Sequence, residues 1–183
     1  IYSIEGGSEV ISSVSGNDLT LTPSENFSGS ESFTVTVNDG SLSDSETFVL
    51  TVIPVNDAPV LASIPDVSFD EDESGSLSLS SSDVDSGDSA TFSISGGTDI
   101  TAALDGSSVS FSAPDNFNGS ESFTVSVADS GDLTDSQSFT VTVNAVNDAP
   151  VATTGLSGTA DEDGSLVVTL SGSDIDGDNL SFS

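Results

Sequence analysis

Hydrophobic and polar residues alternate along the chain in short runs that turn residues interrupt. The clearest strand signal is the stretch from Asn26 to Val37, in which Phe33 and two valines occupy every second position, with threonines between them. A period of two is typical of a strand that buries one face. Similar runs contain Leu19/Leu21, Phe48/Leu50/Val52, Val67/Phe69, Leu77/Leu79, Phe92/Ile94, Val109/Phe111, Phe123/Val125/Val127 and Phe139/Val141/Val143. No segment has a convincing helical period, so the pattern predicts an all-β fold.

The runs belong to an internal repeat. The phrase Val-Asn-Asp-Ala-Pro-Val occupies residues 55–60 and recurs 91 residues later, at 146–151. The segment from Asn26 to Val37 also matches the segment from Asn116 to Val127, with ten of the twelve positions identical. Between the two phrases the pattern gives about seven short strands separated by turn signals, which is typical of a β-sandwich. The sequence therefore predicts tandem seven-stranded β-sandwich domains in an elongated array.

The phase of the repeat predicts the domain boundaries. Residues 1–54 correspond to the C-terminal part of one repeat, 55–145 to a complete repeat, and 146–183 to the N-terminal part of the next. Each outer piece would leave strand edges unpaired. Two interpretations follow. The chain is an interior window of a longer array, as the isoleucine at position 1 also indicates, or identical chains form a filament by exchanging strands between their complementary ends.

The charge composition is one-sided, and it excludes several partners. The chain has no lysine, arginine or histidine, whereas aspartate and glutamate number 31, for a formal net charge of −31. Nothing in the chain can neutralise phosphate, so we expect neither nucleic-acid binding nor attraction to an anionic membrane surface. No apolar run approaches the length of a membrane span, so we expect no direct membrane insertion. The carboxylates must instead face water, salt or metal cations.

Catalysis is not expected either. Histidine, lysine, cysteine and arginine, which serve most often as bases, nucleophiles and oxyanion donors, are all absent. We therefore predict that the protein is not an enzyme and has no catalytic residues. The absence of cysteine also excludes disulfides and cysteine metal sites, although it leaves an extracellular location open.

Two acidic loops have the composition of calcium sites. They are Asp83-Val84-Asp85-Ser86-Gly87-Asp88 and Asp174-Ile175-Asp176-Gly177-Asp178. Calcium takes six to eight oxygen ligands, and aspartates at alternate positions of a loop can converge on one ion. Neither loop is an EF-hand, because the glycine required at loop position six is missing. Acidic loops are also common as merely solvated surfaces.

These motifs, taken in order, carry a family resemblance. Asn-Asp-Ala-Pro, a following acidic cluster, Asp-x-Asp and Phe-Ser-Phe-Ser-like strands resemble cadherin domains. They are most similar to the bacterial cadherin-like, Ig-like repeats of large RTX-type surface adhesins. The resemblance covers essentially the whole chain. It implies a cadherin/Ig-like sandwich that binds Ca²⁺ between successive domains, with the linker supplying ligands.

Carried over by position, the resemblance implies two sets of metal ligands. The first junction would use Asn56, Asp57, Asp83, Asp85 and Asp129. The second would use Glu71, Asn147, Asp148, Asp174 and Asp176. Asp88, Asp178 and Glu162 are additional candidate ligands. The acidic pair that cadherins place between two later strands has no clear match here, and the nearest acids are Asp115 and Glu121.

The sequence thus predicts a non-enzymatic, calcium-rigidified spacer of a long cell-surface adhesin or fibre. Its partners would be neighbouring repeats of the same chain, and its location the cell surface or the extracellular space. A carbohydrate-binding module is an alternative. However, such modules commonly stack sugars on Trp or Tyr, and the chain has no tryptophan and a single tyrosine, Tyr2. The strand-exchange filament is the other alternative.

Overall fold

The computed structural model describes residues 1–182, so Ser183, the last residue of the predicted third segment, lies outside the described residues. The chain divides into two compact units. Unit 1 consists of Ile1–Ala58 together with Asp83–Asp88, and unit 2 of residues 59–82 together with those from 89 onward. No helix occurs within residues 1–182, which confirms the all-β prediction.

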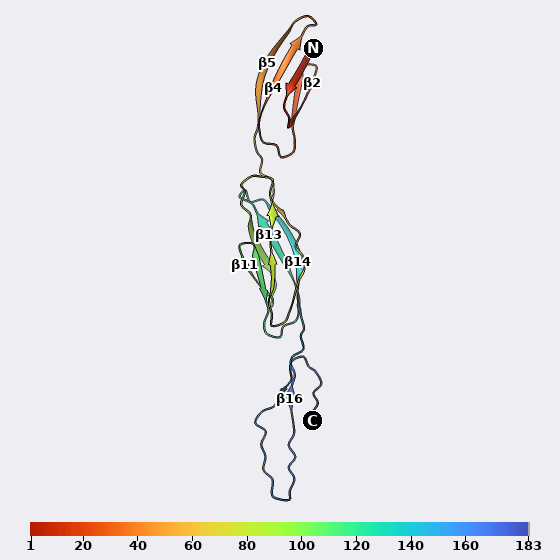
Figure 1. The fold of residues 1–183 in the computed structure, drawn as a ribbon, viewed down its shortest axis with the longest axis vertical. Coiled ribbons are helices and arrows are strands. Elements are labelled where there is room, and N and C mark those ends of the chain that lie inside the picture. Colours follow the sequence, from red (N-terminus) through yellow and green to blue (C-terminus); the bar gives the residue numbers. More distant parts are fainter. Residues whose placement is uncertain (183) are drawn as a thin grey trace. The chain divides into compact units, whose positions relative to one another are not determined.

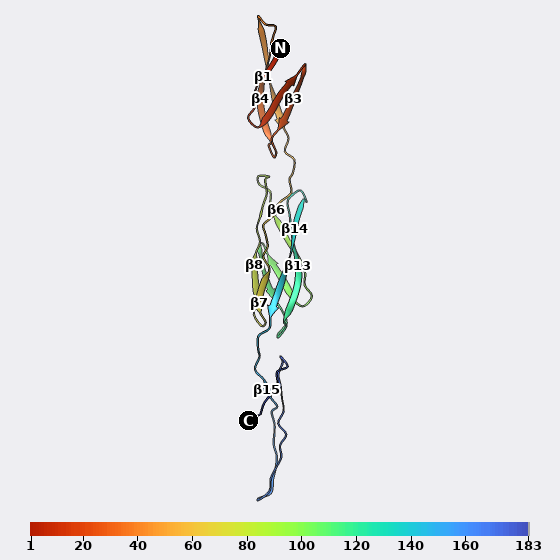
Figure 2. The ribbon, with the colours of Figure 1, turned by 90° about the vertical axis from the view of Figure 1, so that its right-hand side faces the viewer.

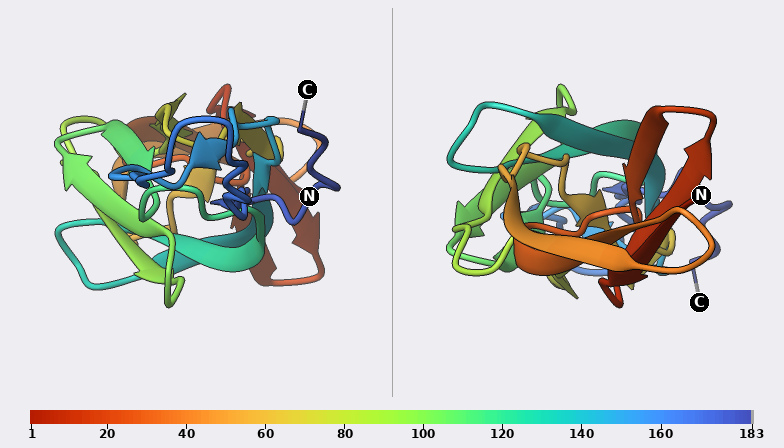
Figure 3. Two further views of the ribbon diagram at one scale, coloured as in Figure 1. Left: turned by 90° about the horizontal axis from the view of Figure 1, so that it is seen from below. Right: turned by 90° about the horizontal axis from the view of Figure 1, so that it is seen from above.

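Unit 1 contains five strands in two sheets (Figures 1 and 2). β1 (Tyr2–Gly6), β4 (Gly29–Asn38) and β5 (Ser43–Val52) form one antiparallel sheet in the order β1-β4-β5. β2 (Val10–Ser15) and β3 (Asp18–Pro23) form a hairpin, whose red strands are also visible in Figure 3. The sequence pattern placed the start of β4 at Asn26. The strand begins at Gly29 instead, because Asn26 adopts a left-handed conformation with φ of 59°.

Unit 2 is built around a four-stranded sheet in the order β10-β13-β14-β7 (Figure 2). Its strands are β7 (Val67–Asp70), β10 (Thr91–Gly96), β13 (Gly119–Ala128) and β14 (Thr134–Asn144). β10, β13 and β14 pair antiparallel, whereas β7 lies parallel to β14. Since β7 comes early in the repeat and β14 late, this parallel pair joins the two ends of the repeat.

A second sheet contains β8 (Gly75–Ser78), β11 (Thr101–Asp105) and β12 (Ser108–Ser112) in the order β11-β12-β8. A further short pair joins β6 (Val60–Leu61) to β9 (Ser81–Ser82). The two larger sheets contain six of the seven strands that the sequence predicted between the linkers. The seventh, expected near Val60 to Ile64, is β6, and β11 was not predicted.

The core of unit 2 lies between these sheets. Phe111 and Phe123 contact each other edge-on, with ring centroids 5.4 Å apart, and both are almost completely buried. Phe139 packs against both rings. The valines at alternate positions of β13 and β14 are also buried, as their period of two predicts. Each such buried side chain contributes about 1.5–3 kcal/mol of hydrophobic stabilisation, so this small set dominates the stability of the repeat.

The opposite, outward face of β13 and β14 carries hydroxyl groups. Ser120 pairs with Thr142 and Thr124 with Ser138, each with 2.9 Å between the oxygens. In unit 1, the hydroxyl pairs Ser30–Thr51 and Thr34–Thr47 repeat this arrangement at 3.0 Å. Alternation thus separates an apolar face from a hydroxyl face on the same strands.

The segment that follows the second linker is mostly irregular (blue in Figure 1). Within residues 146–182, only β15 (Val151–Ala152) and β16 (Gly172–Ser173) form a pair. All residues from 153 to 171 are exposed, including the hydrophobic Leu166 and Leu170. The three-part division at 54/55 and 145/146 stays a prediction, since the two compact units have other limits.

Candidate metal centre

The second linker is held by the loop of aspartates that follows it in sequence. The backbone N–H of Asp148 donates to Asp176 Oδ2 at 2.6 Å. Within the loop, the N–H groups of Asp176 and Asp178 both donate to Asp174 Oδ1, at 3.0 and 3.2 Å. The alternate aspartates therefore fold the loop on itself and turn it toward the linker, as the Asp-x-Asp-x-Asp spacing favours.

Glu71 joins these residues from the other side. It lies in the acidic cluster directly after β7, is only 5% exposed, and accepts a 2.6 Å hydrogen bond from the Val146 N–H through Oε1. Carboxylate oxygens of Glu71, Asp148 and Asp176 lie within 4.8 Å of one another. We call these three residues the acid cluster. The sequence predicted all three as ligands of the second junction, and the fold brings them together.

The acid cluster is electrostatically uncompensated. Burial raises the pKa of Asp148 above its usual range, and the neighbouring charges of Asp176, Asp72, Glu71 and Asp174 raise this pKa further. Asp148 Oδ2 is buried and has no hydrogen-bond partner among the described residues. A buried carboxylate oxygen without a partner is costly, and this chain has no cationic side chain to offer one.

The chemistry of these residues fits calcium. Calcium–oxygen distances of about 2.3–2.6 Å place two ligand oxygens of one ion at most about 5 Å apart. The 4.8 Å limit on the acid cluster satisfies this condition. All the donors are oxygens, as a hard cation prefers, and there is no histidine or cysteine to favour a transition metal.

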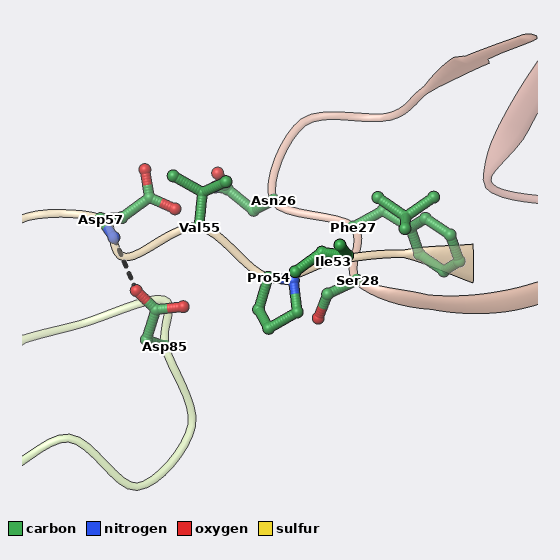
Figure 4. A pocket seen from close by; sticks show the side chains of 9 residues that line it. Asn26, Phe27, Ser28, Ile53, Pro54, Val55, Asp57 and Asp85 are labelled. Carbon is green, nitrogen blue, oxygen red and sulfur yellow. Dashed lines mark hydrogen bonds between the residues drawn. The ribbon is translucent and has the colours of Figure 1, made fainter.

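The first linker repeats this geometry inside unit 1. The Asp57 N–H donates to Asp85 Oδ2 at 2.7 Å, as Figure 4 shows, and the Asp85 N–H donates to Asp83 Oδ1 at 2.8 Å. Asp83 Oδ2, like Asp148 Oδ2, is buried without a hydrogen-bond partner among the described residues. Asp57 and Asp85 line a pocket together with Asn26, Phe27, Ser28, Val52, Ile53, Pro54 and Val55.

Other predicted ligands have structural contacts of their own. The side-chain amides of Asn56 and Asn147 donate to the carbonyls of Asp57 and Asp148, at 3.3 and 2.9 Å. Each asparagine therefore shapes its linker. Asp129 is 7% exposed, and its Oδ1 accepts the N–H groups of Gly131 and Leu133 in the turn before β14.

Two further candidates are less enclosed. Asp88 is half-buried in the loop that belongs to unit 1. Glu162 is exposed, and within residues 1–182 it joins no close group of three acidic side chains. The assignment of every candidate ligand to a metal stays a prediction.

Two roles were not evident from the sequence. Asp72 Oδ1 accepts the Asn116 N–H at 2.9 Å, and this hydrogen bond joins residues 71–73, which follow β7, to the loop before β13. Glu121 accepts N–H groups from Thr98, Asp99 and Ile100, and these hydrogen bonds lower the pKa of its carboxyl. Its carboxylate is therefore engaged in the fold.

Glu31 has the same role in unit 1, where it accepts the N–H groups of Ser8, Glu9 and Val10. The recurrence of a Gly-Ser-Glu-Ser-Phe sequence in both repeats was the available signal for this role.

Comparison with solved structures shows what the fold is similar to. The extracellular domain of protocadherin gamma B4 is 26% identical, with a TM-score of 0.53 over 89% of this chain and 30% of that chain. The cis-dimer structure of protocadherin gamma B7 gives 23% identity and a TM-score of 0.51, over 89% of this chain and 44% of that one. The chain thus spans less than half the length of either protein.

No curated protein sequence matches the chain. Within residues 1–182 there is also no helix with the length and apolar character needed to cross a bilayer.

A family model settles the classification of the fold. The model for the bacterial Ig domain matches residues 2–51 and again residues 56–142. The two matches follow each other in the chain, in agreement with the internal repeat, and no catalytic family is indicated. Ig and cadherin-like domains of this kind typically serve as structural domains at cell surfaces. The chain belongs to the bacterial Ig domain family, as tandem cadherin-like β-sandwich repeats.

Proposed function

We propose that this chain is a stretch of calcium-stiffened repeats that acts as an extracellular spacer in a long surface adhesin or fibre. One observation carries the proposal. Glu71, Asp148 and Asp176 gather their carboxylates within 4.8 Å of one another in a chain that has no cationic side chain. A divalent cation would relieve the repulsion among these acids and supply the partner that Asp148 Oδ2 lacks.

The mechanical effect follows from where the three acids lie in the chain. Glu71 belongs to the repeat before the linker, Asp148 to the linker, and Asp176 to the segment after it. An ion held by all three would join these parts and restrict bending at the linker. Without the ion, the same carboxylates repel one another. Asp174, Asp178 and the Asn147 region are further sources of oxygen.

The expected affinity suits an extracellular location. Extracellular calcium modules have dissociation constants of about 10⁻⁴ to 10⁻³ M. At about 100-fold excess of calcium, one such site stabilises the bound state by about 2.7 kcal/mol. The proposed partners are neighbouring repeats of the same chain. The proposal needs no catalysis, nucleic acid or membrane insertion.

The test is a calcium titration followed by melting temperature and small-angle scattering. We expect calcium to raise the melting temperature and a chelator to lower it, with a shorter or kinked particle in the chelator. The variant Asp148→Asn should lose most of the calcium effect, because it removes a central charge of the acid cluster. The matched control Asp99→Asn, on an exposed loop outside the cluster, should keep the effect. Identical curves with calcium and with chelator would reject the proposal.

A further inference from the structure

The chain contains a single asparagine that is followed directly by glycine, Asn118-Gly119. Gly119 is the first residue of β13, and Asn118 ends the loop before it. Asn118 is exposed, and its side chain has no hydrogen bond among the described residues. By contrast, Asn144 and Asn147 donate hydrogen bonds from their side-chain amides. The Asn118 amide can therefore turn toward the neighbouring backbone.

The fold requires glycine at position 119. Its φ is 157°, which residues with a side chain rarely adopt, and a Cβ there would lie 3.2 Å from Cζ of Phe117. Gly119 also pairs with Val143 at the start of the ladder between β13 and β14. Because glycine has no Cβ, nothing of its own shields its backbone nitrogen from the preceding side chain.

This arrangement allows the chain to react with itself. The Gly119 nitrogen, once it has lost its proton, attacks Cγ of the Asn118 side chain. A new C–N bond forms, the bond to the side-chain nitrogen breaks, and ammonia leaves. Water then opens the resulting cyclic imide at either of its carbonyls, which leaves an aspartate or an isoaspartate. The overall change is the hydrolysis of one amide, so it requires no oxidant, metal or enzyme.

Unit 1 has the same backbone without the reactive side chain. Gly29 has φ of 145°, and a Cβ there would lie 3.5 Å from Cζ of Phe27, which is the arrangement of Gly119 and Phe117. The residue before Gly29 is Ser28, whose hydroxyl group cannot form the cyclic imide. The two repeats therefore differ in this chemistry by one side chain.

The loop before β13 is held at a second point, close to the acid cluster. The Asn116 N–H donates to Asp72 Oδ1 at 2.9 Å, and Asn116 lines a pocket together with Asp148. An isoaspartate at position 118 would lengthen the backbone between Asn116 and the first pair of β13. Either product would also add a negative charge to this loop, and the chain has no cationic side chain to balance it. Both changes should weaken the hydrogen bond between Asn116 and Asp72.

We propose that Asn118 is a site of spontaneous deamidation, at which water converts the side-chain amide to a carboxylate and so loosens the loop that Asp72 holds. The negative charge of the complete repeat then increases as the molecule ages. The reaction is independent of the proposed calcium site, because the reacting atoms belong to Asn118, Gly119 and water.

The test is incubation of the folded full chain at neutral pH, below its melting temperature, in calcium and in chelator. Mass spectrometry then compares its peptides with those of a chain that was not incubated. Because the chain has no lysine or arginine, the peptides are released by a protease that cuts at glutamate. We expect the peptide with Asn118 to gain the mass difference between an amide and an acid. Part of the product should accept a methyl group from an isoaspartyl methyltransferase.

Two variants locate the reaction. Asn118→Gln should lose the mass shift at this position, since glutamine would have to close a larger ring. Ser28→Asn places a second reactive pair before Gly29 and should create the same shift in unit 1. Absence of the shift in the folded chain would overturn the inference, and its appearance only in urea would show that the fold protects Asn118.

The structural consequence is measured on the deamidated chain, which ion exchange separates by its additional charge. We expect the Asn116 amide to exchange its hydrogen faster in this form than in the unmodified chain. The product of Ser28→Asn in unit 1, prepared together with Asn118→Gln, should leave this amide unchanged. Equal exchange at Asn116 before and after deamidation would overturn the loosening of the loop. A melting temperature that does not respond to calcium would reject the proposed metal site and leave the deamidation unaffected.

Discussion

β4 and β13 have nearly the same sequence but different surroundings. Phe33 and Phe123 are equally buried, at 0% and 1% exposure. Further along, Val37 is 42% exposed whereas its counterpart Val127 is fully buried. In unit 2, Val127 lies opposite Asp135, whose carboxylate binds the Leu61 N–H of β6, so the segment around β6 covers this end of the sheet. Alternation therefore encodes which side of a strand is apolar, while burial depends on strands supplied from elsewhere in the repeat.

The largest expected effect is the difference in the free energy of unfolding when Val127 or Val37 is replaced by threonine. Val127→Thr places a hydroxyl among buried apolar side chains and should cost about 1–3 kcal/mol of unfolding free energy. Val37→Thr, at the corresponding exposed position, should change the stability by no more than about 0.5 kcal/mol. Native-state hydrogen exchange at β13 and β4 would measure the two effects separately in one protein. Equal costs at both positions would mean that the two strands have equally closed cores.

A smaller, pH-dependent effect is expected at Glu121. Hydrogen bonds from Thr98, Asp99 and Ile100 lower its pKa below the ordinary value of 4.5. The stabilisation is thus fully present above this value and is lost as the pH falls through the lowered pKa of the folded state. Glu121→Gln should lower the melting temperature at neutral pH and flatten its acid dependence. The reason is that the amide keeps one oxygen acceptor and turns its NH₂ toward a backbone N–H.

Glu31→Gln is the matched variant in unit 1. The pKa of Glu31 is also lowered, first by the backbone N–H groups of Glu9 and Ser8. We expect the same direction of change, detected at the amide of Val10 by hydrogen exchange. If the acid dependence in either repeat is unchanged by the glutamine, its carboxylate does not hold the loop.

The smallest effect is expected on the outward face, where the two regions should agree. Thr124→Ala and Thr34→Ala each remove one hydroxyl of a cross-strand pair and should cost about 0.2–1 kcal/mol. Chemical denaturation monitored by circular dichroism and hydrogen exchange would compare them. Because this face needs no covering strand, the costs should match. A clear difference would show that the covering strands of unit 2 influence even the exposed side of its sheet.

The sequence was most informative where a signal is local. Period-two alternation predicted β13 and β14. The resemblance to cadherin domains, carried over by position, placed Asp148 and Asp176 at the same junction, where the structure brings them into contact. The start of β4 was misplaced at Asn26, since alternation does not reveal a positive φ. In the third segment, Leu166, Val168 and Leu170 also alternate, yet no strand forms there. A strand requires a partner, and none of the described strands lies beside them.

Long-range roles were harder to predict. Glu121 looked like a weak candidate ligand. The repeated Gly-Ser-Glu-Ser-Phe sequence marks this glutamate, but it does not reveal that three N–H groups of a loop some 20 residues earlier bind it. Asp72 lies among other acids of similar appearance, and only the fold selects it to hold Asn116. The composition shows that carboxylates are plentiful, but it does not show which of them accept hydrogen bonds within the fold.

Glu71 accepts the Val146 N–H and also belongs to the acid cluster. These two roles restrict the substitutions that position 71 can tolerate. A glutamine could still accept the Val146 N–H but would bring no charge to the cluster. An aspartate would keep the charge but is one methylene too short to hold both contacts. Two unrelated requirements therefore select the same side chain, and each of these two conservative replacements fails at least one of them.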